Sequence, residues 1–484
     1  MKKVIIIGSG VGGLSSAALL AKEGFQVTVL EKNNDLGGRC SQLKVDGFTF
    51  DLGPSWYLMP DIFEAFYKEL GTSVEKHLKL QRLDPGYRII FDDGEILDVT
   101  GYEQIKKYFE KLEPGAGKKF EKYMEISAYQ YNIAVQEFLP KSYQKITDFL
   151  TLRLAIEGNK LHVFESMDHY IERYFKHPKI KKILEYSLVF LGSSPFKTPA
   201  LYNIMNHVDF NLGVWYPEGG MFEITRSIKK IAESFGAKIH TGKEVVKIEV
   251  IDGEATGVKL KDGTFLKADI VISNADYTFT ENQLLEPKFQ TYPPKYWEKK
   301  TYAPSAFIIY LGLNKKYPEL RHHNLYFCKD WEQNFNDIFK NKKISEDSST
   351  YVCAPSYTDS NVAPKGSENI FLLTPIAADI EVNIEAMTEK SLQLLEQKFG
   401  LKDIRKNIVY QKVFTVQDFK DRYYSYKGTA LGLGHNLLQT AYFRPKQQSK
   451  KVKNLYYVGA GTHPGIGVPM CLLSSQILKK TLTK

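Results

Sequence analysis

A glycine-rich turn directly after a β-branched run limits the fold of this chain more than any other feature. Residues 4–7 (VIII) form a continuous apolar run, which is typical of a strand buried on both faces of a parallel sheet. The run leads into GSGVGG, where Gly8, Gly10 and Gly13 have the spacing G-x-G-x-x-G. The first glycine permits a tight turn, the second lets the backbone approach a pyrophosphate, and the third allows a helix to pack closely on the strand.

The residues after the turn complete a strand–helix–strand unit. Residues 14–22 (LSSAALLAK) predict a helix that ends at Gly24 and directs its positive N-terminus at the turn. Residues 26–30 (QVTVL) predict the second strand, and Glu31 ends it 21 residues after Gly10. An acid at this place accepts hydrogen bonds from a ribose hydroxyl and disfavours a 2′-phosphate. Together these features predict a dinucleotide-binding domain.

A second glycine turn, LGGRC at residues 36–40, indicates which dinucleotide binds. The alternative is an ordinary turn with a surface arginine. In this position the run resembles the extended motif of the FAD-dependent amine oxidase and desaturase superfamily, in which the glycines and the arginine lie along the flavin dinucleotide. The resemblance implies FAD rather than NAD. The residues expected to bind it here are Gly8, Gly10, Gly12, Gly13, Glu31, Lys32, Gly38 and Arg39.

The composition excludes several classes of protein. The chain has 484 residues, 43% of them hydrophobic and 25% charged, which is typical of a folded protein with at least two packed cores. Its four cysteines have no C-x-x-C spacing, so we expect neither a metal site nor a disulfide scaffold. We expect the protein to reside in a reducing compartment. No segment approaches the roughly 18 to 20 apolar residues of a membrane-spanning helix. The net charge of +9 would favour an anionic lipid surface, whereas dispersed Lys and Arg without a binding motif argue against nucleic acid.

The remaining sequence alternates between helical and strand-rich segments. Residues 61–70 predict a helix with Asp61 or its neighbour as N-cap, residues 88–96 a hairpin, and residues 102–186 a helical subdomain. Short strands with Asp-Gly turns between residues 237 and 273 predict a β-meander, and residues 301–401 the sheet of a substrate domain. Near the C-terminus, residues 454–470 predict a strand and another glycine-rich turn, which precedes a final helix. By itself this could be only a tight turn, but paired with the first motif it looks like a segment that closes over flavin.

Seven blocks together resemble the bacterial carotenoid desaturases of the phytoene desaturase type. They follow the expected order over nearly the whole chain: GSGVGGLSSA, LEKNNDLGGR, FDLGPSWYLMPD, GVWYPEGGMFEI, SNAD, APSAFIIYLGL and KVKNLYYVGAGTHPGIGVP. The YPEGG block at residues 216–220 and the THPGIGVP block are the most selective. Met470-Cys471 is a departure, because many relatives have a glycine after the proline.

The resemblance implies an α/β fold with a Rossmann-like FAD-binding domain of the glutathione reductase type, an interleaved α+β substrate domain and a helical lid. We expect FAD-binding segments at 1–75, 215–285 and 416–484, and substrate-domain segments at 76–214 and 286–415. The implied activity is desaturation of a long carotenoid such as phytoene, by hydride transfer to flavin N5 and loss of a proton. The implied location is the cytoplasm, peripherally on the inner face of the cell membrane, with oxygen or a quinone as final electron acceptor.

The same resemblance assigns further residues. For flavin they are Pro54, Ser55, Val245, Gly461, Val468, Pro469 and Met470, and for substrate Trp56, Tyr216 and Gly220. Asp148 matches a proposed catalytic aspartate, but Thr151 stands where its arginine partner belongs, and Arg153 lies two residues further on. Asp148 could instead cap a helix, and water or a flavin atom could take the proton. His322 and His323 are expected in a solvated loop, and His463 is expected to support the flavin or the backbone.

Three other functions stay open on the sequence. A desaturase of a hydroxylated or partly desaturated carotenoid shares every block. A flavoprotein amine or porphyrinogen oxidase shares the N-terminal features but not the later ones. A non-catalytic protein that binds a polyprenoid lipid is the alternative outside the enzymes.

Overall fold

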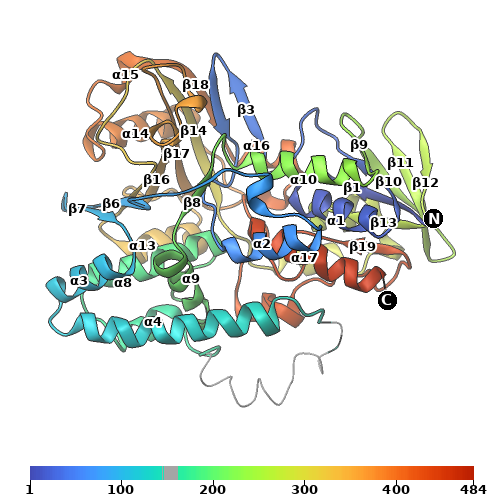
Figure 1. Ribbon diagram of the computed structural model, residues 1–484, viewed down its shortest axis with the longest axis horizontal. Coiled ribbons are helices and arrows are strands. Elements are labelled where there is room, and N and C mark those ends of the chain that lie inside the picture. Colours follow the sequence, from blue (N-terminus) through green and yellow to red (C-terminus); the bar gives the residue numbers. More distant parts are fainter. Residues whose placement is uncertain (144, 146–161, 484) are drawn as a thin grey trace.

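A five-stranded parallel sheet forms one half of the protein (Figure 1). The computed structural model describes residues 1–143, 145 and 162–483. The strand order is β19-β13-β1-β2-β9. Its strands are β1 (Lys3–Ile7), β2 (Gln26–Leu30), β9 (Lys238–His240), β13 (Ile270–Ser273) and β19 (Leu455–Tyr457).

Both faces of this sheet are covered. Val4 and Ile6 pack with the helices on one face, whereas Ile5 and Ile7 pack with a meander on the other, because successive side chains of a strand point to opposite sides. The helices are α1 (Val11–Lys22), α2 (Pro60–Glu69), α10 (Phe222–Ser234) and α17 (Val468–Leu482). The meander consists of β10 (Val245–Ile251), β11 (Glu254–Leu260) and β12 (Phe265–Lys267).

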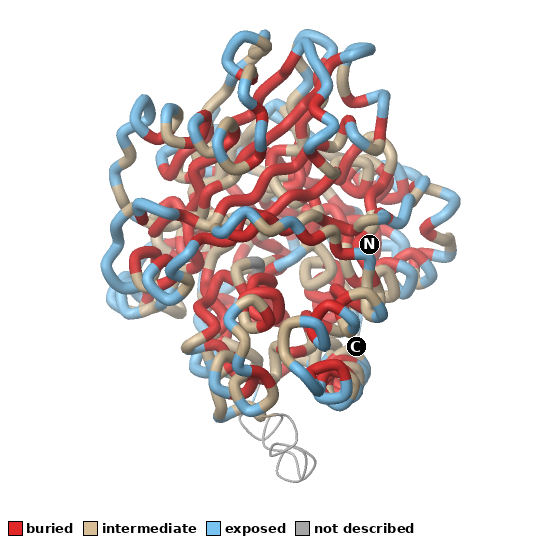
Figure 2. The backbone as a smooth tube through the Cα atoms, turned by 90° about the vertical axis from the view of Figure 1, so that its left-hand side faces the viewer, coloured by how far each residue is buried: buried red, intermediate tan, exposed pale blue. Residues whose placement is uncertain are grey.

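A seven-stranded mixed sheet forms the other half, in the order β18-β14-β17-β16-β15-β6-β7. All its pairs are antiparallel except β15 with β6. Its strands are β6 (Tyr87–Phe91), β7 (Ile96–Val99), β14 (Ser305–Leu313), β15 (His323–Phe327), β16 (Thr350–Cys353), β17 (Glu368–Ile376) and β18 (Ile408–Phe414). Buried residues concentrate along these strands, and exposed ones along the outer turns (Figure 2).

Helices cover this second sheet on both sides. On one face lie α3 (Tyr102–Leu112), α4 (Ala116–Ile133), α7 (Met167–Glu172) and α8 (Pro178–Glu185), and α9 (Ile204–His207) packs on α4. On the other lie α14 (Ile384–Gln397) and α15 (Ile404–Asn407). The remaining helices are α11 (Tyr277–Phe279), α12 (Pro294–Glu298), α13 (Trp331–Asn336) and α16 (Val416–Tyr423). A hairpin is formed by β3 (Gln42–Val45) and β4 (Phe48–Asp51), and a two-stranded antiparallel sheet by β5 (Leu80–Arg82) and β8 (Trp215–Pro217).

The fold class predicted from the sequence is confirmed, and three local predictions need correction. Helix α1 begins at Val11 rather than residue 14, and α17 begins at Val468, because a proline in the first turn suits a helix start. Helix α2 has Met59 as N-cap, so the prediction of Asp61 or Pro60 was wrong. The Asp61 carboxylate instead accepts a hydrogen bond of 2.8 Å from the hydroxyl of Tyr131.

Candidate functional site

The carboxyl ends of parallel strands meet at one edge of the five-stranded sheet. Just after β13, the backbone N–H of Asn274 donates to Ile7 O at 2.8 Å, and after β19 that of Val458 donates to Ser273 O at 3.0 Å. The side-chain amide of Asn274 then donates to Val458 O at 2.9 Å and links the two strand ends. Ligands of open α/β sheets bind outside this edge.

The predicted glycine turn lies at this edge and has no space for side chains. A Cβ atom would lie 2.8 Å from Asn274 Oδ1 at Gly10, 3.0 Å from Gly459 Cα at Gly12, and 2.2 Å from Gly8 O at Gly13. Helix α1 begins here with Gly10 as its N-cap, and no side chain caps it. The first backbone amides of the helix are therefore available to an anion.

Glu31 stands beside the turn, as the spacing predicted, and is 5% exposed. Its Oε2 accepts hydrogen bonds from the backbone N–H of Ser9 at 2.9 Å and from the Ser9 hydroxyl at 2.8 Å. Its Oε1 accepts from the backbone N–H of Asn33 at 2.9 Å and from the Asn33 amide at 3.1 Å. The carboxylate is thus fixed in place by donors from both sides.

Lys32 and Val245 flank Glu31 in different ways. The Lys32 ammonium lies 3.6 Å from the centre of the Tyr424 ring, which directs it toward α16. Val245 is buried at the start of β10. Two residues before it, the backbone N–H of Lys243 donates to Glu31 O at 2.7 Å. The structure therefore brings Val245 close to the acid that ends β2.

The second glycine turn packs directly on the first. A Cβ at Gly38 would lie 3.4 Å from Gly10 Cα, and one at Gly53 would lie 1.9 Å from Arg39 O. The Arg39 side chain donates from Nη2 to the Ser425 hydroxyl at 2.9 Å. Its Nε is buried and has no hydrogen-bond partner among the described residues. A buried donor without a partner is costly, which fits an acceptor that only a bound group supplies.

The C-terminal glycine turn follows β19 and lies at the same edge of the five-stranded sheet as the first glycine turn. A Cβ at Gly461 would lie 2.9 Å from the Cβ of Tyr277. Helix α17 follows, with Gly467 as an N-cap that has no capping side chain and with Val468 and Pro469 as its first residues. Met470 packs against an apolar cluster that includes Met59 and Tyr131.

Arg444 supports this C-terminal glycine turn, although no motif in the sequence pointed to it. Its side chain is 1% exposed. All its described acceptors are backbone carbonyls, those of Leu433, Gln439, Ala460 and Thr462. Desolvation lowers the pKa of the guanidinium to about 10. A buried cation held only by carbonyl groups leaves a positive field beside the turn.

An aromatic and polar cluster lies where residues 54–57 reach the seven-stranded sheet. The Trp56 indole stacks on the His323 ring with centroids 4.3 Å apart and 9° between the planes. The Ser55 hydroxyl lies 2.8 Å from the hydroxyl of Tyr351. Tyr216 is 2% exposed and makes an edge contact with the ring of His322, with centroids 4.5 Å apart. The structure therefore brings Ser55, Trp56 and Tyr216 together.

The prediction of a solvated loop for the two histidines was wrong. His323 begins β15 and is 0% exposed, and His322 is 1% exposed. Desolvation lowers the pKa of His322 to about 3 and that of His323 well below its usual value. Both rings are therefore neutral at physiological pH.

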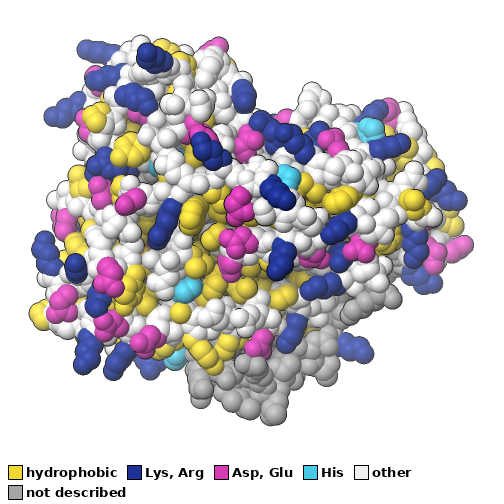
Figure 3. Space-filling view, viewed as in Figure 1, with side chains coloured by type: hydrophobic (Ala, Val, Ile, Leu, Met, Phe, Trp, Pro, Cys, Tyr) yellow, Lys and Arg dark blue, Asp and Glu magenta, His cyan; other side chains and the backbone are white. Residues whose placement is uncertain are grey.

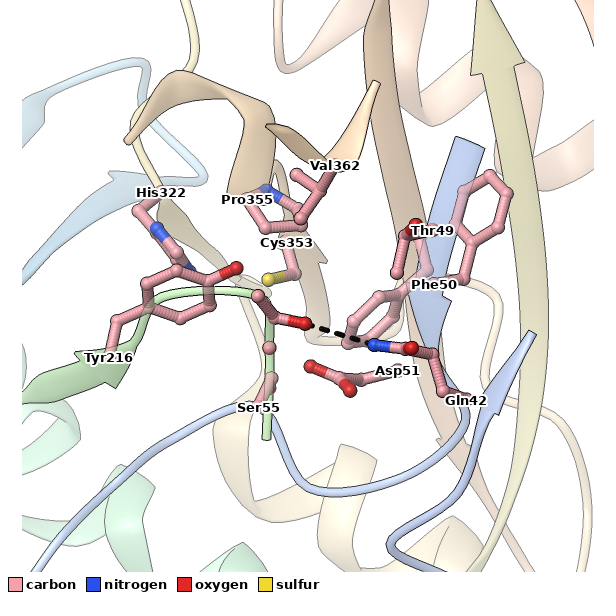
Figure 4. A pocket seen from close by; sticks show the side chains of 13 residues that line it. Gln42, Thr49, Phe50, Asp51, Ser55, Tyr216, His322, Cys353, Pro355 and Val362 are labelled. Carbon is pink, nitrogen blue, oxygen red and sulfur yellow. Dashed lines mark hydrogen bonds between the residues drawn. The ribbon is translucent and has the colours of Figure 1, made fainter. Parts of the chain in front are cut away.

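A narrow cavity of about 10 Å³ lies beside this cluster (Figure 4). Its lining includes Ser55, Tyr216, Gly220 and Asp51. A Cβ at Gly220 would lie 2.7 Å from Asp51 Oδ2, so only glycine leaves room for this carboxyl group. Burial raises the pKa of Asp51 to about 7, although the backbone N–H groups of residues 221 and 222 donate to it.

A second buried carboxyl group, Asp209, was not found from the sequence. Its Oδ2 accepts hydrogen bonds of 2.7 Å from the hydroxyls of Tyr87 and Tyr186, and both of those rings contact Trp56. Desolvation raises the pKa of Asp209 to about 7. Asp148 and Arg153, the predicted catalytic pair, lie outside the described residues.

The residues at the sheet edge fit an FAD molecule. Two helix N-termini without capping side chains suit its pyrophosphate, the glycine turns give it room, and Glu31 suits a ribose. Asn274 of the SNAD block, directly after β13, belongs to the same set, although it was not among the residues predicted to bind FAD.

Comparisons with known proteins agree with this geometry. Residues 11–477 match the family Flavin containing amine oxidoreductase. The chain is 45% identical to a carotenoid 3,4-desaturase of Haloarcula japonica over 98% of this chain and 96% of the relative. It is 33% identical to a zeta-carotene-forming phytoene desaturase of Myxococcus xanthus over 99% of this chain and 94% of the relative.

Two solved structures share the fold. An oxidoreductase from Methanosarcina mazei superposes with a TM-score of 0.66 at 21% identity, and covers 100% of both chains. Putrescine oxidase bound to putrescine superposes with a TM-score of 0.64 at 15% identity, covering 100% of this chain and 99% of the oxidase. The sequence matches and the site together establish that the chain belongs to the flavin-containing amine oxidoreductases and, within them, to the carotenoid desaturase family, with FAD as its cofactor.

Proposed function

We propose that the chain removes hydrogen pairs from a carotenoid and so lengthens its conjugated polyene. The observation that carries this proposal is the 45% identity to a carotenoid 3,4-desaturase over 98% of the chain. The reaction converts CH–CH into C=C by loss of a hydride and a proton. Bound FAD supplies the hydride acceptor.

The residues proposed to hold FAD surround the sheet edge. The uncapped amides after Gly10 would bind the pyrophosphate, and Glu31 would accept hydrogen bonds from the ribose. Arg39 would direct its unpartnered Nε–H to an FAD acceptor. Val468 and Pro469 would present the N-terminus of α17, which disfavours positive charge and favours negative charge on the bound group.

The substrate is proposed to reach the site along the aromatic side chains of Trp56 and Tyr216 and past Gly220, which lines the adjoining cavity. Loss of a hydride beside double bonds leaves an allylic cation, and aromatic faces stabilise a cation by about 0.5 to 2 kcal/mol. Buried apolar walls also exclude water from the reacting carbons. Asp148 and Arg153 stay the proposed pair for the proton.

The similarities to named relatives differ in a way that bears on which carotenoid the chain uses. Identity to the carotenoid 3,4-desaturase is 45%, but only 33% to relatives named for phytoene or diapophytoene. This difference favours a carotenoid that already contains a polyene over phytoene.

The experiment compares two bacterial hosts, one that accumulates phytoene and one that accumulates an already conjugated acyclic carotenoid. We expect the second host to form a product that absorbs at longer wavelength, because each desaturation extends the conjugation. The Trp56→Ala variant should lower product yield while bound FAD per chain stays unchanged. Conversion of phytoene alone would reverse the substrate assignment. Oxidation of an amine with no change in any carotenoid would contradict the proposed function.

Peripheral binding to the inner face of the cell membrane is also proposed. Within the described residues, none of the helices is long and apolar enough to span a bilayer. Acidic and basic side chains are intermixed on the face seen in Figure 3. The support comes from a short segment that exposes Leu437, Leu438 and Phe443 by 36%, 67% and 38%. Leu438→Ser should weaken co-sedimentation with anionic vesicles, and unchanged binding would contradict this role. Oxygen or a quinone remains the proposed final acceptor.

A further inference from the structure

The strands of the second sheet bring two histidines and a cysteine together in the core. His323 of β15 is paired directly with Cys353 of β16, so the two side chains lie on the same face of the sheet. Tyr351, two residues before Cys353, shares that face. His322 precedes β15, where its carbonyl accepts a hydrogen bond of 2.8 Å from the N–H of Ala354. The three residues are 1%, 0% and 1% exposed for His322, His323 and Cys353.

We propose that His322, His323 and Cys353 bind one divalent cation of the zinc class. One ligand atom from each lies within 4.8 Å of the others. His323 Nδ1 is 3.7 Å from Cys353 Sγ. Bonds of about 2.0 Å to nitrogen and about 2.3 Å to sulfur put these atoms about 3.6 Å apart in a tetrahedral zinc site. The cysteine–histidine separation therefore already suits the ion, and the ligand atom of His322, within 4.8 Å of the other two, must move closer by at most about 1.5 Å.

One ligand nitrogen of the cluster is buried without a partner in the described part of the chain, and the other is held by a single hydroxyl group. His322 Nε2 is buried and has no hydrogen-bond partner among the described residues. His323 Nδ1, the atom beside Cys353, lies 2.6 Å from the hydroxyl of Tyr351, and the ion would replace that hydrogen bond. His322 Nδ1 lies 2.9 Å from the Thr358 hydroxyl, which can accept its proton and leave Nε2 free as the ligand atom. The Trp56 indole stacked on His323 fixes the orientation of the second ring. An unpartnered buried nitrogen is a cost that coordination would remove.

The adjoining cavity leaves space for a fourth ligand of the ion, and a nearby carboxyl group can balance part of its charge. The cavity of about 10 Å³ is lined by both His322 and Cys353, and has about the size of one water molecule (Figure 4). Asp51 lines the same cavity. Binding would release the thiol proton of Cys353, so that the thiolate and one nearby carboxylate balance a doubly charged ion. Two imidazoles and a thiolate select zinc over magnesium or calcium, which prefer oxygen ligands.

The metal site shares its cavity with Ser55, Tyr216 and Gly220, so the test measures bound metal and needs no activity. The purified flavoprotein is dialysed against a chelator, incubated with excess Zn²⁺ or Co²⁺, freed of unbound ion and analysed for metal per chain. We expect about one equivalent of either ion. Tetrahedral Co²⁺ with a thiolate ligand should also give d–d bands at longer wavelength than oxidised flavin absorbs.

Variants identify the ligands. Cys353→Ser and His322→Gln should each lose the bound metal and the cobalt bands, while bound FAD and the circular dichroism spectrum report that they fold. Cys328→Ser is the matched control, because Cys328 is also a buried thiol in the same sheet region but is outside this cluster. Absence of stoichiometric metal in the unmodified protein with either ion would overturn the proposal. Metal content unchanged in both ligand variants would overturn it as well.

Discussion

Replacing Glu31 by alanine tests the cofactor site at the residue that the structure holds most firmly. The variant removes a carboxylate that accepts four hydrogen bonds, all from Ser9 and Asn33. Hydrogen bonds to a charged group contribute about 1.5 to 3 kcal/mol each. Loss of a single ribose hydrogen bond should therefore weaken FAD binding about 10- to 150-fold, since 1.4 kcal/mol corresponds to a factor of ten. The buried backbone N–H of Ser9 also loses its acceptor, which should lower the free energy of unfolding by about 1 to 3 kcal/mol, and the half-buried N–H of Asn33 should add less.

The assay is titration of the apoprotein with FAD, followed by calorimetry or by quenching of flavin fluorescence. Glu31→Gln keeps one acceptor oxygen and should fall between the wild type and Glu31→Ala. Glu368→Gln is the matched control, because Glu368 is a buried carboxylate that accepts from Tyr317 and Ser356 in the other sheet. The control should lose stability but keep its FAD affinity. The reasoning fails if Glu31→Ala binds FAD as tightly as the wild type, or if the control loses as much affinity.

Two further predictions concern the turn and the buried carboxyl group. Gly13→Ala should abolish FAD binding, because its Cβ would lie 2.2 Å from Gly8 O. The control Gly24→Ala has nothing within 4 Å of its Cβ, so it should keep FAD and lose only about 1 to 2 kcal/mol of stability for its positive φ. Retention of flavin by Gly13→Ala would contradict this. Folding raises the pKa of Asp209 from 3.8 to about 7, so the native state keeps a proton that the unfolded state releases, and the free energy of unfolding should fall as pH rises between about 4 and 7. Asp209→Asn should flatten this slope in denaturant titrations at a series of pH values, with the part due to Asp51 remaining, and an unchanged slope would count against the buried acid.

The first half of the site followed from local rules in the sequence. A buried parallel strand, a turn that excludes Cβ atoms and an acid at the next strand end are all encoded within thirty-one consecutive residues. Gly10, Gly13 and Glu31 therefore lie where the spacing predicted. The hairpin turn at Asp93-Gly94 was predictable for the same reason, since its glycine has φ +87°.

The second half depended on contacts that no local pattern contains. His322 and His323 follow a charged stretch and look like a loop, but the pairing of β15 with β16 and β6 buries them. Asp209 is a buried acid that accepts from Tyr87, 122 residues away in the sequence, and Arg444 is a buried cation held by backbone carbonyls of the surrounding turns. Helix α2 begins at Pro60 with Met59 as N-cap, and Asp61 in its first turn accepts a hydrogen bond from Tyr131, 70 residues away in the sequence. In each case tertiary packing overrides the local preference.

One short segment joins the two halves of the site and explains how a shared flavin fold can serve different substrates. Leu52 N–H donates to Ser41 O at 2.9 Å beside the second glycine turn, and Gly53 packs on the backbone of Arg39. Only two residues later, Ser55 contacts Tyr351 and Trp56 stacks on a histidine of the other sheet. Backbone contacts fix the cofactor end of this segment, so substitutions there disturb the fold itself. Side-chain contacts form the other end, and they can change while the cofactor site stays intact. Differences in carotenoid preference within the family are therefore expected to arise at the aromatic cluster of the seven-stranded sheet, and not at the glycine turns.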